Sequence, residues 1–434
     1  MRRQLIIGNG GAAISAVKAI RSISPNDEIT IISKESYLAY SPSLITYYLS
    51  GKIEFEDLFI CDESFYQQNR VDIRLNRNVA KVVTKLKKVY LDRGEVLKYD
   101  NLLLATGAQP VIPPIEGLDL PGVFTLYTAD DAREIVTFLE GKERVAVIGG
   151  GLVGLQTLGA LSNSGKKTIL VEMKDQILPQ ALDLQGARIL EEWLRQKGVD
   201  IHLGQRVSGI YGGDSKKVIS LASGNELMTD GVILAVGFRP KVDFLQGSGI
   251  ELADGVIVDQ YCRANKNGVY AAGDIVQAPD PLKGGRPTIN ACWPNAIKQG
   301  KVAGLNMAGK KVQLLQNVRY NAFTVFGLPC VSIGLIGAVN IQLEEEVSQK
   351  ETNYRKLLFN DDILVGAILI GDVGDAGVIA NIIERHDLFP RLQKTLRSHR
   401  FSTYSIRDYI WLKTNLWDLP GKDSIPQRDM SKLE

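Results

Sequence analysis

Short apolar runs and helix-like patterns alternate along the first part of this 434-residue chain. Apolar runs of strand length occur at residues 5–7, 28–32, 89–92, 97–104, 145–148, 168–171 and 231–234. Helical spacing follows the first run as far as residue 23, follows the run at 145–148, and returns at residues 295–308. Strands that alternate with helices are typical of βαβ units, so the pattern predicts an α/β fold built on parallel sheets.

The pattern changes after residue 312. Apolar alternation at residues 331–336, 354–359 and 363–370 predicts strands, and residues 375–384 and 390–396 have helical spacing. We expect a third, α+β domain here. The last stretch, residues 401–434, is polar but contains Trp411 and Trp417. Four prolines between residues 110 and 121 predict a linker earlier in the chain.

Two glycine fingerprints of one kind directly follow apolar runs. The first comprises Gly8, Asn9, Gly10, Gly11, Ala12 and Ala13, and the second comprises Gly149, Gly150, Gly151, Leu152, Val153 and Gly154. Glycines here let the backbone turn tightly and approach a pyrophosphate, which then lies at a helix N-terminus. A lone match can be an ordinary strand–turn–helix, but two matches in this context predict two dinucleotide sites. A flavin and a nicotinamide nucleotide are the obvious pair.

Residues at the ends of other predicted strands add to these sites. An acid after the second strand of a βαβ unit accepts the hydroxyl groups of an adenosine ribose. Glu172 has that position in the second unit, with a surface glutamate as the alternative reading. In the first unit Ser33 stands at the usual position, and we favour Glu35, two residues later. Gly273 and Asp274 would form a simple turn elsewhere, but beside the fingerprints they predict a carboxylate for a sugar hydroxyl.

The composition argues against several other classes of function. The chain has 51 basic and 49 acidic residues, so its charge indicates neither a nucleic acid nor a membrane partner. Its most apolar late stretch, residues 363–370, is too short to span a bilayer, and the first strand begins too early to leave room for a signal peptide. The four cysteines form no C-x-x-C pair and have no metal-like spacing to the three histidines. We expect a cytoplasmic protein without a metal site, a structural disulfide or an iron–sulfur cluster of its own.

The motifs and their order along the chain resemble those of the pyridine nucleotide–disulfide oxidoreductase superfamily. Its members are flavoproteins with two dinucleotide-binding domains. The likeness covers residues 4–310, and the C-terminal region resembles the interface domain of the family more loosely. Besides the two fingerprints, the matching segments are Ala105-Thr106-Gly107, Ala235-Val236-Gly237-Phe238-Arg239-Pro240 and Tyr270-Ala271-Ala272-Gly273-Asp274. The resemblance implies a glutathione-reductase-like fold with two Rossmann-like domains and a C-terminal α+β interface domain.

The expected domains are an FAD-binding domain in two parts, residues 1–118 and 247–311, an NAD(H)-binding domain at 119–246, an interface domain at 312–400 and a tail at 401–434. By the resemblance, the first fingerprint and the Gly-Asp segment hold FAD, and the second fingerprint holds NAD(H). Further residues expected at FAD are Lys34, Glu35, Ser43, Val79, Ala105, Thr106, Gly107, Gly273, Asp274, Asn295 and Ala296. Further residues expected at NAD(H) are Glu172, Val236 and Gly237. The helix after Trp293 is expected to point its N-terminus at the N1/O2 edge of the flavin, where it would stabilise the reduced form.

Two positions depart from the branch of the family that the chain resembles most, which comprises NADH oxidases, coenzyme A-disulfide reductases and nitrite-reductase-like proteins. That branch has a redox cysteine in the turn where this chain has Ser43. A serine cannot form a sulfenate, a persulfide or a mixed disulfide. Cys292 is a candidate for a place near the flavin, with a buried structural cysteine as the alternative. Gln156 replaces a glutamate common among relatives, which keeps hydrogen bonding but removes a charge.

We therefore expect an FAD-dependent NADH:acceptor oxidoreductase subunit, selective for NADH over NADPH, that passes electrons between NAD(H) and an iron–sulfur, ferredoxin-like partner. NAD-linked subunits of oxidoreductase complexes resemble this chain in the serine and in the segment from Trp293 to Ala296. The alternatives are a stand-alone NADH oxidase or disulfide reductase, and a non-enzymatic redox-sensing or scaffold flavoprotein. We expect a complex or a homo-oligomer, with Trp411 and Trp417 as anchors for the partner or packed on the chain's own third domain or a twin subunit.

Overall fold

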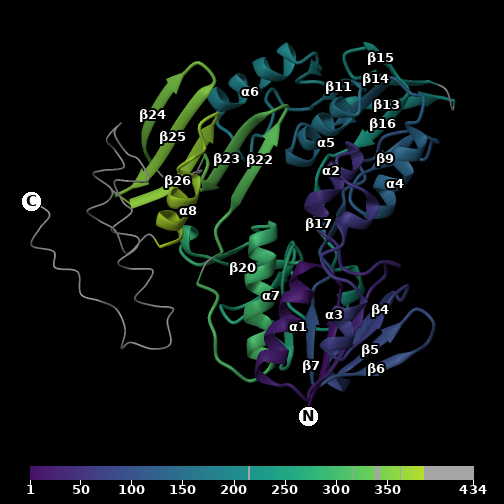
Figure 1. Ribbon diagram of the computed structural model, residues 1–434, viewed down its shortest axis with the longest axis vertical. Coiled ribbons are helices and arrows are strands. Elements are labelled where there is room, and N and C mark those ends of the chain that lie inside the picture. Colours follow the sequence, from purple (N-terminus) through teal and green to yellow (C-terminus); the bar gives the residue numbers. More distant parts are fainter. Residues whose placement is uncertain (214–215, 316, 338–342, 362, 386–434) are drawn as a thin grey trace, which may run out of the picture.

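Three units of secondary structure make up the computed structural model of this protein (Figure 1). It describes residues 1–213, 216–315, 317–337, 343–361 and 363–385. In Figure 1 the first α/β unit lies at the bottom, the second at the top, and a C-terminal sheet lies beside the second. Within these residues, none of the helices has the length and apolar character needed to cross a bilayer. The predicted fold class, two parallel α/β units and a C-terminal domain, is confirmed.

The first unit is a five-stranded parallel sheet in the order β19-β7-β1-β2-β3. Helix α1 (Gly11–Ile23) connects β1 to β2, and a three-stranded antiparallel sheet precedes β7. The parallel strands are β1 (Arg3–Ile7), β2 (Glu28–Ile32), β3 (Val71–Arg74), β7 (Asn101–Leu104) and β19 (Val269–Ala271). The antiparallel strands are β4 (Val79–Val83), β5 (Lys88–Leu91) and β6 (Val96–Lys98). Residues 269–271 return to this sheet from late in the chain, so the unit is discontinuous.

The single strand predicted for residues 97–104 is wrong, because the chain divides there into β6 and β7. Asp100 lies between them, and its carboxylate accepts hydrogen bonds from the backbone N–H and the guanidinium of Arg3. These bonds draw residue 100 to the start of β1, which places the following residues in the parallel sheet beside β1. Hydrophobicity alone did not reveal the break.

The second unit repeats the first. Its parallel sheet has the order β12-β11-β10-β16-β9, in which β10, β11 and β16 correspond to β1, β2 and β7. The strands are β9 (Val123–Thr125), β10 (Arg144–Ile148), β11 (Lys167–Val171), β12 (Asp200–His202) and β16 (Gly231–Leu234), with an antiparallel sheet of β13 (Val207–Gly212), β14 (Lys217–Leu221) and β15 (Glu226–Thr229). The helices are α4 (Ala129–Phe138), α5 (Leu152–Asn163) and α6 (Leu184–Gln196). The internal duplication expected from the motifs thus extends to the order of the strands.

Shorter elements connect the two units. Strands β8 (Ala108–Pro110) and β17 (Phe238–Pro240) pair where the chain passes between the units. The remaining elements are α2 (Ile45–Leu49), α3 (Glu63–Gln68), β18 (Val256–Ile257), β20 (Val276–Asp280), β21 (Arg286–Thr288) and the 3₁₀ helices η1 (Pro42–Leu44), η2 (Phe55–Leu58), η3 (Thr84–Leu86), η4 (Asp243–Leu245) and η5 (Pro281–Lys283). The boundaries expected for the domains stay predictions.

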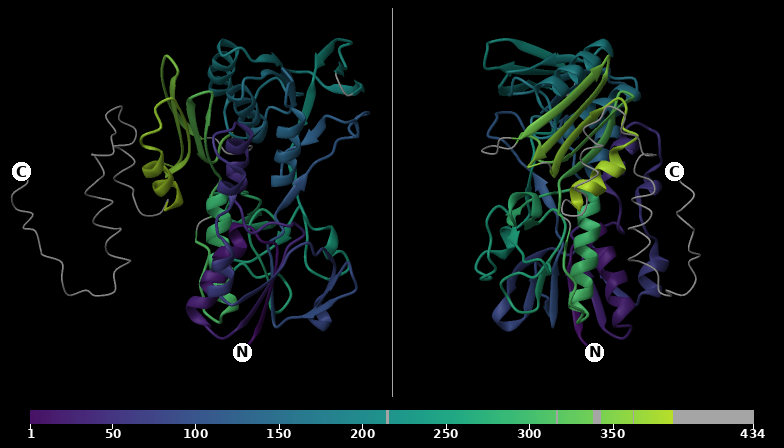
Figure 2. Two further views of the ribbon diagram at one scale, coloured as in Figure 1. Left: turned by 45° about the vertical axis from the view of Figure 1, so that its right-hand side comes forward. Right: turned by 90° about the vertical axis from the view of Figure 1, so that its left-hand side faces the viewer.

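Helix α7 (Trp293–Met307) packs along α1, as all three ribbon views show (Figures 1 and 2). Small residues permit this contact. A Cβ atom at Gly300 would lie 2.2 Å from the carbonyl oxygen of Ala12, and one at Gly304 would lie 2.5 Å from that of Ala16. Real Cβ atoms do not approach so closely, so glycine is required at both positions. The close packing places the start of α7 beside the first fingerprint.

The third unit is an antiparallel sheet in the order β22-β23-β26-β25-β24. Its strands are β22 (Tyr320–Val325), β23 (Leu328–Gly334), β24 (Glu344–Lys350), β25 (Asn353–Asn360) and β26 (Ile363–Ile370), and helix α8 (Ala376–Glu384) packs on β26. Asp183, at the start of α6, accepts hydrogen bonds from Tyr354 at 2.7 Å and from Lys356 at 3.0 Å. These bonds attach the third sheet to the second unit. The helix expected at residues 390–396 and the tail with Trp411 and Trp417 lie outside the described residues.

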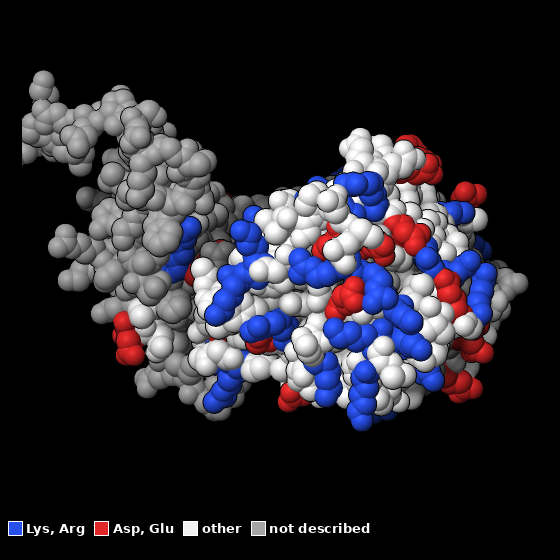
Figure 3. Space-filling model, turned by 90° about the horizontal axis from the view of Figure 1, so that it is seen from below, with Lys and Arg blue, Asp and Glu red and all other residues white. Residues whose placement is uncertain are grey.

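The lower end of the molecule bears basic side chains interleaved with acidic ones (Figure 3). Surface charges of the described residues form pairs, such as Arg3 with Asp100 and Arg263 with Asp259, both at 2.8 Å. Pairing of this kind neutralises the surface locally, in keeping with the near balance of charges in the sequence.

Candidate functional site

A cleft of about 1130 Å³ lies where the three units meet. Its walls come from the ends of β10, β11 and β16, from the turn before α2, from the segment after β19, and from the start of the third sheet. Gly149 and Glu172 lie at one end, and Ser43 and Asp274 also line the cleft. The fold therefore brings together residues that the sequence assigned to two different dinucleotides.

The second fingerprint turns at the end of β10. Gly149 has a φ of +113°, and a Cβ atom there would lie 2.3 Å from the carbonyl oxygen of Ala235. A side chain at Gly151 would instead meet no atom within 4 Å. Because Gly151 precedes the first turn of α5, that open space lies at the helix N-terminus, where a phosphate group binds favourably. Leu152 and Val153 open the helix and line the cleft.

Glu172 follows β11 and lies against this fingerprint. Its Oε2 accepts the N–H of Gly150 at 2.5 Å, and its Oε1 accepts the N–H of Lys174 at 2.8 Å. The carboxylate is thus held at the cleft wall, where the sequence placed an acceptor for ribose hydroxyls. Arg206 lines the same end and was not anticipated, because the strand order and not a local motif brings it there.

The first fingerprint has the same construction. A Cβ atom at Gly8 would lie 2.1 Å from the carbonyl oxygen of Ala105, which repeats the relation of the second fingerprint to the strand beside it. A side chain at Gly10 would meet nothing within 4 Å, as at its counterpart. A Cβ atom at Gly11 would lie 2.6 Å from the ring of Trp293, at the start of α7. The tryptophan therefore packs directly on this loop.

Two polar groups assigned to FAD, in Asn9 and Asp274, lack partners in the described part of the chain. Asn9 accepts a hydrogen bond from Tyr66 at 3.0 Å through Oδ1, whereas its buried Nδ2 has no acceptor. Asp274 lines the cleft, and no described residue donates a hydrogen bond to its carboxylate; burial raises the pKa of this group. Buried polar groups are nearly always satisfied, so the amide of Asn9 fits a ligand with phosphate oxygens. The partly buried carboxylate of Asp274 fits a ligand with hydroxyl groups. FAD has both.

Other residues assigned to FAD lie around these groups. Gly273 donates its N–H to Gln299, and Ala296 of α7 lies close to Gly273. The hydroxyl of Thr106 donates a hydrogen bond to the carbonyl oxygen of Lys241 at 3.1 Å. Gly107 directly precedes β8. At the other site, Val236 and Gly237 line the cleft as expected.

Glu35 does not have the place that Glu172 has. Its carboxylate accepts a hydrogen bond from Tyr40 at 2.7 Å, and burial raises its pKa. The strand registers match Ser33 with Glu172, because both residues directly follow the second strand of their sheets. The geometry thus favours Ser33 over Glu35 at the matching position, since the two extra residues carry Glu35 beyond the strand end. Lys34 between them is exposed.

The side chains of Asn295 and Val79 make contacts within the protein. Asn295 donates from Nδ2 to the carbonyl oxygens of Asn290 at 2.9 Å and Val318 at 3.0 Å. Val79 is buried in the core of the first unit. The amide nitrogen of Asn295 and the side chain of Val79 are therefore engaged within the protein, and the assignment of both residues to FAD stays a prediction. The sequence motif did not reveal this, because it shows position and not orientation.

Ser43, in the 3₁₀ helix η1, is exposed and lines the cleft with Gln156 of α5. Arg319 and Asn321, at the start of the third sheet, line the cleft as well. None of the four cysteines is among the described residues that line it. The cleft therefore offers the hydroxyl group of Ser43 at the position where the resemblance implied a redox cysteine.

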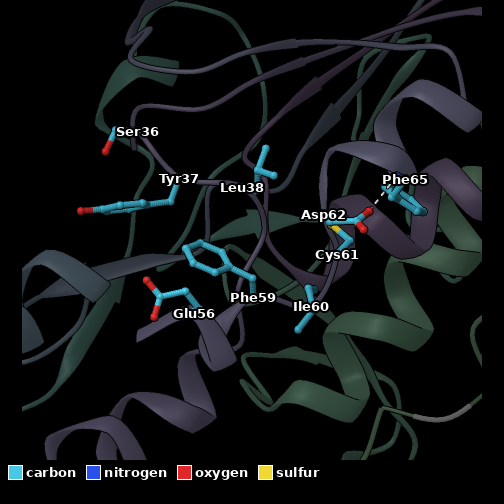
Figure 4. A pocket seen from close by; sticks show the side chains of 9 residues that line it. All are labelled: Ser36, Tyr37, Leu38, Glu56, Phe59, Ile60, Cys61, Asp62 and Phe65. Atoms are coloured by element: carbon cyan, nitrogen blue, oxygen red, sulfur yellow. Dashed lines mark hydrogen bonds between the residues drawn. The ribbon is translucent and has the colours of Figure 1, made fainter. Parts of the chain in front are cut away.

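One cysteine lines a second pocket, of about 720 Å³, formed by the segments after β2 and before α3 (Figure 4). The Cys61 thiol hydrogen-bonds Tyr66 at 3.5 Å, and burial raises its pKa. Burial also raises the pKa of Cys262 and Cys292, and raises that of Cys330 to about 12. A thiol reacts as its thiolate, so the surroundings of each of these four cysteines disfavour its reactive form.

Comparison with known proteins agrees with this geometry. The family model of pyridine nucleotide-disulphide oxidoreductases matches residues 2–300, and that of the rubredoxin NAD+ reductase C-terminal domain matches residues 320–387. The NADH-dependent phenylglyoxylate dehydrogenase subunit epsilon of Aromatoleum evansii is 32% identical over 397 residues, which are 89% of this chain and 93% of that protein. The NADH oxidase of Methanocaldococcus jannaschii is 35% identical over 316 residues, 71% of this chain and 70% of that protein.

Among solved structures, the NAD-dependent persulfide reductase from A. fulgidus superimposes with a TM-score of 0.83 at 27% identity, covering 88% of this chain and 77% of the other. The family match covers both fingerprints and the segment with Asp274. The resemblance expected from the motifs is thus confirmed. The chain belongs to the pyridine nucleotide-disulphide oxidoreductase family and is an NAD(H)-dependent enzyme that uses FAD.

Proposed function

We propose that this protein is the FAD-dependent subunit that passes electrons between NAD(H) and an iron–sulfur partner protein. A relative similar over 89% of the chain is named as a subunit of an NADH-dependent dehydrogenase, and the C-terminal match is to a domain of rubredoxin reductases. Both support a protein acceptor. The cytoplasmic location of the protein stays a prediction.

The observation that carries the proposal is the absence of a usable thiol in the described part of the cleft. Ser43 stands where a redox cysteine is expected in the branch that the chain resembles, and no described cysteine lines the cleft. Enzymes that reduce disulfides or peroxides through a thiol need a thiolate that attacks the substrate. Electrons that reach this site must therefore leave to an external acceptor.

The chain's own residues would hold the two cofactors for this exchange. The first fingerprint, Asn9 and Asp274 present groups that suit FAD, and the second fingerprint and Glu172 present groups that suit NAD(H). When bound, FAD supplies the means to couple two-electron exchange with a nicotinamide to one-electron exchange with an iron–sulfur centre. The protein contributes the binding, the orientation and the electrostatics of that exchange.

Steady-state oxidation of NADH with several acceptors tests the proposal. We expect rapid turnover with a ferredoxin or a rubredoxin, slow turnover with oxygen, and no effect of prior alkylation by iodoacetamide. Coenzyme A disulfide and hydrogen peroxide serve as thiol-dependent acceptors. Fast reduction of either one, abolished by alkylation, would show a disulfide reductase or peroxidase; turnover with oxygen alone would show a stand-alone NADH oxidase. A protein that binds FAD but oxidises NADH with none of these acceptors would be a sensor or scaffold.

A further inference from the structure

Arg319 is a charged residue of the cleft that no motif in the sequence assigned. It directly precedes β22 and lines the cleft together with Asn321, two residues later, as neighbours on one face of a strand do. Its carbonyl oxygen accepts the N–H of Gly334 at 2.9 Å. Its guanidinium makes neither a hydrogen bond nor an ion pair with any residue that the structure describes. Arg319 therefore brings to the cleft wall a permanent positive charge that no described residue pairs.

The start of α7 lies at the same part of the cleft. Asn295, in the first turn of α7 after its N-cap Cys292, donates from Nδ2 to the carbonyl oxygen of Val318, the residue before Arg319, at 3.0 Å. Ala291, just before this cap, lines the cleft. A 15-residue helix carries a partial positive charge at its N-terminus. The guanidinium and the helix end thus act on one region.

Asp274 and Arg319 line this cleft without forming an ion pair. Two opposite charges that do not neutralise each other both remain available to a ligand. Such a ligand needs hydroxyl donors for the carboxylate and acceptor oxygens for the guanidinium. A flavin nucleotide has both, in its ribityl hydroxyl groups and in the carbonyl oxygens of its pyrimidine ring.

We propose that Arg319 sets the reduction potential of the bound FAD by stabilising the negative charge that the flavin ring gains on reduction. This inference rests on the function proposed above and names a residue that tunes it. Reduction places negative charge on the pyrimidine part of the ring, and a fixed positive charge beside that part would favour the reduced state. The helix end contributes in the same direction, but only Arg319 contributes a full charge.

The test compares three variants by two measurements that do not depend on turnover. Arg319→Met removes the charge, Arg319→Lys keeps it, and Arg206→Met removes an equal charge from the nucleotide end of the same cleft. The first measurement is the midpoint potential of the FAD by equilibration with a reference dye. The second is the dissociation constant of sulfite, which binds to oxidised flavin and bleaches it more readily when positive charge lies near the pyrimidine ring. FAD content and melting temperature show that each variant is folded and loaded, and Arg319→Gln replaces Arg319→Met if that variant does not hold FAD.

For Arg319→Met we expect sulfite to bind about tenfold more weakly and the midpoint potential to fall by about 30 mV, the equivalent of tenfold for a two-electron couple. Arg319→Lys should restore most of the wild-type sulfite affinity and midpoint potential. Arg206→Met should change neither quantity. Unchanged values in Arg319→Met would overturn the proposal. A weaker affinity for NADH in that variant would then place the guanidinium at a nucleotide phosphate, and a raised KM for ferredoxin would place it at an acidic side chain of the acceptor. Failure of the wild-type protein to bind FAD would instead refute the proposed function.

Discussion

Replacing Asp274 by asparagine should change cofactor affinity and folding stability in opposite directions. Without FAD, this carboxylate has no hydrogen-bond donor in the described part of the chain, and burial raises its pKa. Asparagine has nearly the same shape and no charge. The cofactor-free variant should therefore be more stable than the wild type, although it has lost an acceptor that FAD needs.

The sizes of the two changes, in the stability of the FAD-free protein and in the affinity for FAD, follow from the hydrogen bonds that the carboxylate lacks or makes. Leaving a fully buried polar group unsatisfied costs about 1–3 kcal/mol, and Asp274 is only partly buried, so the variant without FAD should be more stable by about 1 kcal/mol or less. A hydrogen bond to a charged group contributes about 1.5–3 kcal/mol, so the affinity for FAD should fall by about 10- to 150-fold. The two effects come from one atom group and can be measured separately.

The pH dependence has a definite sign. Because the pKa of Asp274 is raised above its ordinary value of 3.8 in the folded protein, the folded state holds the proton more tightly than the unfolded state. The stability of the FAD-free wild type should therefore fall as the pH rises from 3.8 through the raised value. Asp274→Asn removes this contribution, so the difference between the two proteins should grow over the same range. Thermal melts of FAD-free protein and titrations followed by flavin fluorescence give both quantities.

A buried aspartate nearby provides the control. Asp280 lies six residues later and is satisfied, since its two oxygens accept from the N–H of Leu282 and the side chain of Asn290, both at 3.0 Å. Asp280→Asn should destabilise the protein by about 1–3 kcal/mol and leave the affinity for FAD unchanged. Two results would contradict this reasoning: a variant Asp274→Asn that is likewise less stable without FAD, or one that binds FAD as tightly as the wild type. Either would show that the carboxylate is not a group that lacks a partner until FAD binds.

Three further predictions concern the second unit. Gly149→Ala should lower the melting temperature and weaken NADH binding at least tenfold, measured by calorimetry and titration, because its φ of +113° and the carbonyl of the neighbouring strand exclude a side chain. The wild type should prefer NADH over NADPH, and Glu172→Gln should reduce the ratio of the two kcat/KM values about tenfold or more, since the carboxylate repels a 2′-phosphate. Burial acts to raise the pKa of Asp183, but bonds from Gly186, Tyr354 and Lys356 hold it below 3.8. Asp183→Asn should therefore cost about 1–3 kcal/mol above that pH in thermal melts, with the difference disappearing in more acidic solution.

The local features of this fold could be predicted from the sequence because they depend on residues close together in the chain. A fingerprint, its strand and its helix occupy about twenty residues, and the two copies identified both units. Of the antiparallel sheets, the sequence predicted a strand at β5 and part of β6, but β4, the sheet β13-β14-β15 and the antiparallel pairing were not predicted, because those short strands lack a regular pattern. Ser33 and Glu35 show a further limit, since the choice between them depends on how β2 pairs with β1.

The positions that sequence motifs cannot give are those fixed by contacts between distant segments, and Asn295 shows how such contacts carry function. The motif assigned it to FAD, yet its amide holds the carbonyl of Val318, the residue before Arg319, at 3.0 Å. Asn290 is tied to Asn317 by a similar bond at 2.5 Å, so the segment that leads to Arg319 is fixed to the start of α7 at two points. Asn295 thus belongs to the flavin site through the residue it positions, if Arg319 acts as proposed. A change at Asn295 would then disturb the potential of the flavin without removing any charge from the cleft.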